Sequence, residues 1–244
     1  AKEQIEASRD GLGRPNFTIA VFGQFSSGKS TLLNALLGRL DRPLSDLRGQ
    51  RGAPLPMGFL PVTARLTTIR YGELPTITVV RTDGSRDRRS LKWFVDNSPL
   101  RDTSKKNQEA FGDIEQFELT YPFEAGKAGI VLIDTPGADE TPEREAIIQR
   151  ALDQADAAIL LFQASSHASR FEIDFAHHVM GFSQAGPFTV INRRGGMVID
   201  DRYKQFAWAR IVKGLKNGPD YAPDRFADER IFFVDVLAAL RGRL

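Results

Sequence analysis

Short apolar runs rich in β-branched residues recur along this chain, and stretches with helical spacing separate most of them. Such runs predict buried strands, whereas apolar positions three and four residues apart predict helices. The predicted strands are 17–22, 66–71, 76–81, 116–121, 129–134, 157–162, 188–192 and 230–234. The predicted helices are 2–10, 31–37, 142–154, 170–181, 202–216 and 236–243. This alternation favours an α/β fold, with a mostly parallel sheet and helices on both faces.

Three stretches depart from the alternation. Strands 66–71 and 76–81 are close together in the sequence, so we expect them to pair as a local antiparallel edge, with a hairpin turn at Asp83-Gly84 after them. Residues 41–62 are rich in proline and glycine, which predicts a long mobile loop. The polar segment 86–115 predicts no clear element until the strand at 116.

Composition mainly excludes classes of protein. A chain of 244 residues with 41% hydrophobic and 26% charged residues has globular values. The net charge of +2 does not indicate a nucleic-acid partner. The absence of cysteine from the sequence excludes disulfides and thiolate metal sites, and it fits a reducing, cytoplasmic compartment. The sequence contains no run of 18 apolar residues, so it predicts no membrane-spanning helix.

The strongest chemical signal is the segment GQFSSGKST at residues 23–31, which fits G-x-x-x-x-G-K-[ST]. It follows a predicted strand and opens a predicted helix, the context in which such a loop wraps the phosphates of a nucleoside triphosphate. We expect Lys29 to reach the β and γ phosphates and the Ser30 hydroxyl to bind Mg²⁺. The predicted phosphate-binding residues are Gly23, Ser26, Ser27, Gly28, Lys29, Ser30 and Thr31.

Two further positions fit the same chemistry. Asp134-Thr135-Pro136-Gly137 follows an apolar strand, so Asp134 is expected to hold Mg²⁺ through water and the Gly137 N–H to sense the γ phosphate. Thr63 ends the predicted loop, and we expect its hydroxyl to bind Mg²⁺ when a γ phosphate is present. Read singly, the first pattern is an ordinary turn and Thr63 is the residue before a strand.

Together the segments GQFSSGKSTLLNALLG (23–38), LPVTARLTTIRYG (60–72) and DTPG (134–137) resemble the GTPase head of bacterial dynamin-like proteins, relatives of mitofusins. The resemblance runs from about residue 15 to the end. It implies a P-loop NTPase with an extended Ras-like G domain at 15–244, preceded by a neck-like helix and linker at 1–14. It also implies GTP hydrolysis to GDP with Mg²⁺, and a homodimer that forms head to head across the nucleotide.

The resemblance further implies membrane remodelling by a protein that is cytoplasmic and peripheral to the membrane. In that family, segments absent from this chain contact the lipid, so we expect an excised head or a minimal form.

Some positions depart from the family. Ala138 stands where many GTPases have a glutamine that orients water, and Phe25 stands where dynamins often have one. The expected catalytic groups are then Ser26, Lys29, Thr63 and Gly137. Ser26 matches the family position that helps to hold a monovalent cation, K⁺ or Na⁺. We therefore expect slow basal turnover that rises on dimerisation.

Base recognition also departs from the family pattern. GTPases normally read guanine with Asn-Lys-x-Asp after a late strand, and here Asn192 and Arg193 occupy the first two positions. Gly195 replaces the aspartate, so discrimination against adenine is expected to fall unless Asp200 or Asp201 substitutes. The alternative interpretation of Asn192 is a cap at the end of a strand.

Two functional classes stay open at this point. The first is a GTPase that cycles a dimer on and off. The second is a nucleotide-gated assembly module with little or no hydrolysis, which Phe25, Ala138 and Gly195 favour. A P-loop ATPase of another type fits Thr63 and Asp134 less well.

Overall fold

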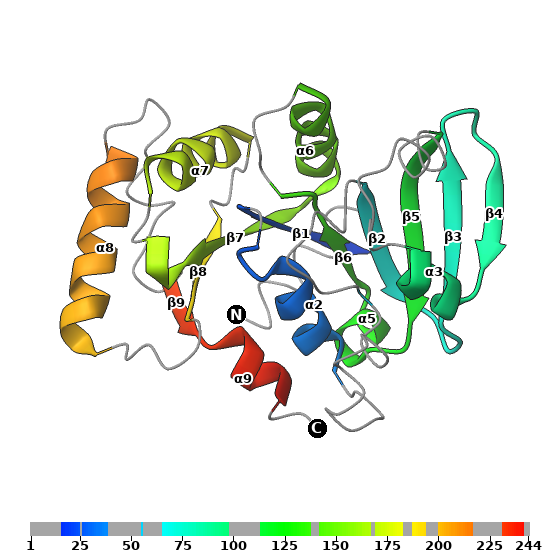
Figure 1. Ribbon diagram of the computed structural model, residues 1–244, viewed down its shortest axis with the longest axis horizontal. Coiled ribbons are helices and arrows are strands. Elements are labelled where there is room, and N and C mark those ends of the chain that lie inside the picture. Colours follow the sequence, from blue (N-terminus) through cyan, green and yellow to red (C-terminus); the bar gives the residue numbers. More distant parts are fainter. Residues whose placement is uncertain are drawn as a thin grey trace.

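The computed structural model describes residues 16–24, 26–38, 55, 65–97, 113–137, 142–166, 169–182, 187–193, 200–216 and 231–241 (Figure 1). Its strands are β1 (Phe17–Gly23), β2 (Leu66–Tyr71), β3 (Thr76–Arg81), β4 (Arg86–Arg89), β5 (Ile114–Tyr121), β6 (Ile130–Asp134), β7 (Ala157–Gln163), β8 (Phe188–Asn192) and β9 (Ile231–Val234). Its helices are α2 (Lys29–Leu37), α3 (Leu91–Asn97), α5 (Glu124–Lys127), α6 (Pro142–Gln154), α7 (Arg170–Phe182), α8 (Asp201–Lys216) and α9 (Val236–Arg241), with a 3₁₀ turn η2 at Ala164–Ser166. The predicted strands and helices are all present apart from the helix at 2–10, which lies outside the described residues.

The described strands form one sheet in the order β4-β3-β5-β2-β6-β1-β7-β8-β9. Pairing is parallel from β6 through β1, β7 and β8 to β9, and also between β2 and β5. It is antiparallel between β2 and β6, between β3 and β5 and between β3 and β4. The mostly parallel α/β fold is therefore confirmed, with the antiparallel pairs gathered in one half of the sheet.

The expected pairing of 66–71 with 76–81 is wrong, because β5 lies between the two strands. Ile69 of β2 is paired with Leu119 of β5 on one side and with Leu132 of β6 on the other. Ile69, Leu119 and Leu132 all lie in one apolar core, so β2 packs between two strands that share its apolar face. The antiparallel edge does exist, but β3 and β4 form it.

The hairpin turn at Asp83-Gly84 joins these two edge strands. Gly84 has φ +80°, a left-handed conformation that favours glycine, and Arg81 N donates to Ser85 O at 2.9 Å. Sequence analysis missed β4 and α3, which occupy part of the polar segment 86–115. Apart from Phe94, the described side chains of these two elements are exposed or half-buried, so periodicity gave little signal.

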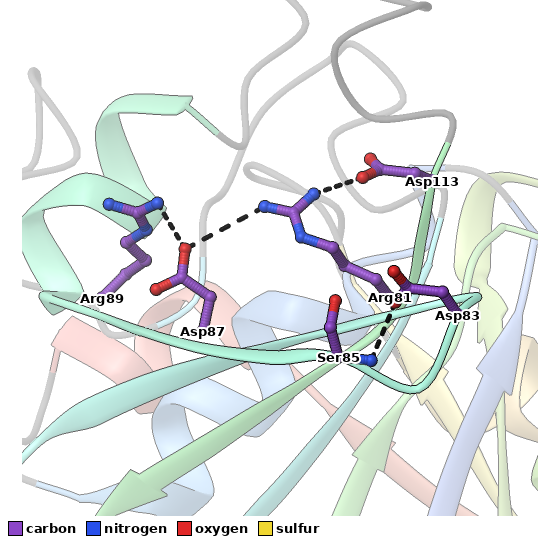
Figure 2. A network of polar contacts seen from close by, with 6 residues as sticks. All are labelled: Arg81, Asp83, Ser85, Asp87, Arg89 and Asp113. Atoms are coloured by element: carbon purple, nitrogen blue, oxygen red, sulfur yellow. Dashed lines mark hydrogen bonds and ion pairs between the residues drawn. The ribbon is translucent and has the colours of Figure 1, made fainter.

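Arginines on this hairpin are paired with acidic neighbours (Figure 2). Arg81 binds Asp113 and also lies 4.0 Å from Asp87, and Asp87 pairs with Arg89 as well. The arginines of this hairpin thus lie at a solvated edge of the sheet and form ion pairs with neighbouring carboxylates. Charged side chains on an edge strand also oppose pairing with the edge of another sheet.

Helices cover both faces of the sheet. In Figure 1, α6 and α7 lie above the sheet and α2 and α9 below it. One apolar core joins α6, α7 and α8 to side chains such as Phe22 and Ile133, and the other joins α2, α3 and α9 to side chains such as Val21 and Leu132. Successive residues of one strand thus enter opposite cores, as the two-residue period of a strand requires.

One position within 41–62 is fixed, in contrast to the predicted mobile loop. Leu55 is fully buried in the α2-side core. Its backbone N–H donates to Asn34 Oδ1 at 3.0 Å, and Asn34 Nδ2 donates to Leu55 O at 2.9 Å. A side-chain amide that pairs with both the N–H and the C=O of one buried residue replaces the pairing that a strand would provide. The rest of 41–62 lies outside the described residues.

Candidate nucleotide-binding site

The predicted phosphate loop connects the end of β1 to the start of α2, in the middle of the sheet. Ligands bind at the carboxyl ends of parallel strands in open α/β sheets, and β1 has parallel neighbours on both sides. Ser26 has φ +59°, a left-handed conformation that is uncommon outside glycine. A left-handed residue in such a loop is the arrangement that gathers successive N–H groups around an anion.

Two glycines of the loop lie where no side chain fits. A Cβ on Gly23 would lie 2.5 Å from Leu161 O on β7, and a Cβ on Gly28 would lie 2.6 Å from Asn192 Nδ2 on β8. Gly28 is also the N-cap of α2, with φ +103°. The loop therefore packs against the ends of β7 and β8, and these two strands support it from one side.

Lys29, the first residue of α2, is only 6% exposed. Its ammonium group donates to Gly23 O at 2.9 Å and to Gln24 O at 3.0 Å. These partners are neutral carbonyl groups of the same loop. Phosphate oxygens accept stronger, charge-assisted hydrogen bonds, so the lysine sits beside the loop with partners that an anion can outcompete.

Asp134 ends β6 and is fully buried next to the phosphate loop. Its Oδ2 accepts from Ser30 Oγ at 2.8 Å. Burial raises the pKa of the Asp134 carboxyl from 3.8 to about 6, although the positive charge of Lys29 and the Ser30 hydroxyl both oppose the rise. The neighbouring Thr135 fixes the end of the strand by donating to Val21 O at 2.7 Å.

This pair of side chains fits a magnesium site. Asp134 Oδ1 is buried and has no hydrogen-bond partner among the described residues, so one carboxylate oxygen remains available. In the described ranges, no group of three His, Asp or Glu side chains forms a protein-only metal cage. Mg²⁺ usually takes one or two carboxylates together with phosphate oxygens and water, for which a serine and an aspartate at a phosphate loop are suitable.

Asn192 acts as a clamp between three segments. It is 5% exposed, its Nδ2 donates to Ser27 O at 2.8 Å, and its Oδ1 accepts from Val236 N at 3.1 Å. The amide thus joins the phosphate loop to β8 and to the first residue of α9. The alternative interpretation as a strand-end cap describes this arrangement, while the predicted contact with a base stays a prediction.

Arg193 follows this clamp and is held by α9. Its Nε and Nη2 donate to Asp235 Oδ2 at 3.1 and 2.8 Å. Asp235 in turn accepts from Ala238 N at 2.8 Å, which caps α9. Sequence analysis missed Asp235, whose only signal was its position before a short predicted helix.

Several predicted positions cannot be placed together with these. Thr63, Phe25, Ala138 and Gly195 lie outside the described residues, so their roles stay predictions. Gly137 is described and half-buried beyond the end of β6. Asp200, one of the two candidate substitutes for the missing aspartate, caps α8 by accepting from Tyr203 N at 2.7 Å.

A buried glutamate that sequence analysis missed shapes the neighbouring loop. Glu172 is 2% exposed and accepts from Ser169 N at 2.8 Å and from Gln163 N at 3.1 Å. Glu172 N donates to Ser169 Oγ at 3.3 Å, which completes a reciprocal capping box at the start of α7. The Ser-x-x-Glu spacing before an apolar helix was the signal available in the sequence. Glu172 fixes the chain just after β7, at the same end of the sheet as the phosphate loop.

These features define a P-loop nucleotide-binding domain: a glycine loop between a central strand and a helix, a buried lysine, and a serine–aspartate pair. The family model for the dynamin family matches residues 19–194. The chain therefore belongs to the dynamin family, whose members are GTPases.

Several known proteins are similar to this chain. A bacterial dynamin-like protein from Nostoc punctiforme is 24% identical over 258 residues, covering 99% of this chain. Dynamin-like protein 2 of Campylobacter jejuni is 34% identical over 199 residues, covering 81% of this chain. The chain spans only 35% and 29% of these two relatives.

A solved structure agrees with the fold. The structure of an oligomerised bacterial dynamin pair, described as a mechanism for long-range sensing and tethering of membranes, matches with a TM-score of 0.63. The match has 21% identity and covers 99% of this chain and 43% of that one. Within the part of the present chain that is described, none of the helices has the length and apolar character needed to cross a bilayer.

The close packing of the phosphate loop can be tested with Gly28→Ala. We expect this variant to lose nucleotide binding and to unfold more easily, because the new methyl group meets Asn192 Nδ2 and the backbone is left-handed. Gly84→Ala is the matched control, since Gly84 is also left-handed but has nothing within 4 Å of a new Cβ. That control should lose about 1–2 kcal/mol of stability and keep full nucleotide affinity. Equal nucleotide affinity in the two variants would contradict the packing argument.

The raised pKa of Asp134 predicts a pH-dependent stability in the nucleotide-free protein. Because the folded protein holds this proton more tightly than the unfolded chain, stability falls as pH rises from about 4 to about 6. The rise in pKa from 3.8 to about 6 corresponds to a loss of about 3 kcal/mol.

Asp134→Asn should remove this fall, because the amide stays neutral at every pH. We expect the variant to exceed the wild type in stability at pH 7 and to lose magnesium-assisted nucleotide binding. Urea unfolding across pH 4–8, without nucleotide or metal, measures the first effect. An unchanged pH profile in the variant would show that another group causes the fall.

Proposed function

We propose that this domain binds GTP with Mg²⁺ and hydrolyses it to GDP, with slow turnover in the isolated chain. The observation that supports this most directly is the hydrogen bond from Ser30 Oγ to Asp134 Oδ2, next to the buried ammonium group of Lys29. Two segments more than a hundred residues apart in the sequence thus meet at the end of a parallel strand, in the pattern that a metal–phosphate group requires.

Binding of the polyphosphate exchanges weak partners for strong ones. Lys29 Nζ now donates to two neutral carbonyl groups, Gly23 O and Gln24 O. A phosphate oxygen accepts a charge-assisted hydrogen bond of roughly twice the strength. The loop N–H groups and the start of α2 add their partial positive charge. Because the lysine is already close to the loop, little rearrangement of its side chain opposes binding.

The metal would be held by Ser30 and Asp134, together with Thr63. When bound, Mg²⁺ neutralises charge on the β and γ phosphates. Gly137 lies three residues after Asp134 and would place its N–H near the γ phosphate. Ser26, with its left-handed backbone, would help to hold a monovalent cation, K⁺ or Na⁺.

The base would bind beside Asn192 and Arg193. The amide nitrogen and oxygen of Asn192 already have partners at Ser27 and Val236. Asn192 therefore contributes first by holding the phosphate loop, β8 and α9 together. Arg193 is oriented by Asp235. Guanine is the proposed base because the chain belongs to a GTPase family, and weak discrimination against adenine is expected from Gly195.

Assembly and location are proposed from the relatives. The similar bacterial dynamin pair is described as oligomerised and as a mechanism for the long-range sensing and tethering of membranes. We propose that two copies of this domain associate through their nucleotide faces and that the protein is cytoplasmic and peripheral to a membrane. The chain's own residues supply the nucleotide site, and no nucleic-acid partner is proposed.

The nucleotide site is tested with Lys29→Ala. Loss of a charged hydrogen bond of about 1.5–3 kcal/mol should weaken GTP binding by at least about 10-fold and up to about 100-fold. Lys127→Ala is the matched control, because that lysine pairs with Glu124 on the surface at 2.9 Å. Calorimetric titration with GTP, GDP and ATP analogues, with and without Mg²⁺, gives both affinity and base preference. Unchanged affinity in Lys29→Ala would refute the proposed site.

Turnover is tested by phosphate release across a range of protein concentrations. An arginine finger contributes about 10³–10⁵ in rate to other GTPases, so turnover should be slow unless a cation or a group supplied in trans takes that role. We expect the rate per molecule to rise with concentration and to be higher in K⁺ or Na⁺ than in a large organic cation. A fast rate at high dilution would contradict the role of dimerisation. A rate near zero at every concentration would favour the nucleotide-gated assembly module instead.

A further inference from the structure

A second buried hydroxyl lies across the sheet from the metal-binding carboxylate. Thr67 of β2 is paired with Asp134 of β6 in antiparallel register. Both residues are fully buried. Neither Thr67 Oγ1 nor Asp134 Oδ1 has a hydrogen-bond partner among the described residues. Two unsatisfied polar atoms, one donor and one acceptor, thus belong to one cross-strand pair.

The two side chains lie on the same face of the sheet. Residues directly opposite each other on antiparallel strands point to the same side, with Cβ atoms about 4.5–5.5 Å apart. The next pair along, Ile69 with Leu132, lies entirely in the core on the α2 side. Residues two positions apart share a face, so Thr67 and Asp134 also lie on the side of α2. Ser30, the first partner of Asp134, belongs to α2.

A buried hydroxyl without a partner is unfavourable, and valine has nearly the same shape without that cost. β2 is rich in apolar and β-branched residues, so a valine would suit position 67 by packing alone. A hydroxyl at this position is explained if it donates a hydrogen bond to the neighbouring carboxylate. A threonine donor within reach of a carboxylate fixes its orientation, as the outer partners of metal ligands commonly do.

We propose that Thr67 is a positioning residue for the magnesium site: its hydroxyl donates to Asp134 Oδ1, directly or through one water, and orients the carboxylate for the metal. The inference rests on the proposed function, because it assigns Thr67 a role at the same site. With the metal bound, Ser30 would donate to one carboxylate oxygen and Thr67 to the other, and each oxygen would keep a lone pair for the metal or its water. The carboxylate is thereby fixed from α2 and from β2 at once.

The experiment measures the Mg²⁺ concentration that half-saturates binding of a fluorescent GTP analogue. Thr67→Val should raise this concentration by about 10-fold, whereas Thr67→Ser should stay close to the wild type. Analogue affinity in excess EDTA should be the same for all variants, because Thr67 touches no part of the nucleotide in this arrangement. An equal half-saturation in the wild type and in Thr67→Val would overturn the proposal.

The matched control is Thr189→Val. Thr189 of β8 is also fully buried, and its Oγ1 also lacks a partner in the described part of the chain. It lies three residues before Asn192, toward the start of β8. Its replacement should leave the magnesium requirement unchanged. A similar rise in Thr189→Val would assign the effect to general loosening of the sheet and would overturn the role of Thr67.

A thermal scan of the nucleotide-free variants separates positioning from folding. Because the hydroxyl has no partner there, Thr67→Val should unfold at the wild-type temperature or above it. If the valine variant does not fold, Thr67→Ala takes its place in the same titration, with the same two outcomes. A wild type whose analogue binding does not depend on Mg²⁺ would refute the proposed function itself, before any variant is compared.

Discussion

Two opposite charges are buried together at the end of β1 and β6, and the surrounding structure is arranged to make their burial tolerable. Lys29 is 6% exposed and Asp134 is fully buried. Isolated charges in an apolar interior are very unfavourable unless they are paired or hydrogen-bonded. Here each charge has neutral partners: two carbonyl groups for the lysine and one hydroxyl for the aspartate. The charge of Lys29 also favours the charged form of Asp134, so the two compensate each other in part. Under the proposed function, a bound metal and polyphosphate would complete this compensation.

Side-chain amides and carboxylates hold the frame around these charges. Asn192 joins the phosphate loop to β8 and α9, and Asn34 joins α2 to the peptide unit of Leu55. Glu172 likewise accepts from the backbone N–H of Ser169, in the chain after β7. In each case a buried polar side chain satisfies backbone groups that regular secondary structure leaves unpaired. The chain can then take irregular shapes at these places while the backbone groups named here stay hydrogen-bonded.

Most of the fold could be predicted from the sequence because its central strands are buried on both faces. Runs such as 130–133 and 157–162 are continuously apolar and hard to mistake. The phosphate loop was equally clear, since a fixed motif stood between a strand and a helix. What could not be predicted was long-range pairing: β5 enters between β2 and β3, although the latter two are neighbours in sequence. Local pattern carries no information on which distant strand completes a pair.

The same limit explains which site residues were missed. Asp235 and Thr67 have ordinary sequence surroundings, and their relevance comes from Arg193 and Asp134, which lie far away along the chain. Thr67 becomes adjacent to the carboxylate only because β2 pairs with β6 and not with β3. That pairing also connects the segment that follows Thr63 to the strand that ends in Asp134. A displacement of one strand along the other would break hydrogen bonds of the ladder, so the two segments are mechanically linked. The pairing of β2 with β6 thus brings the strand that begins three residues after Thr63 beside the strand that ends in Asp134, the other predicted metal-binding residue.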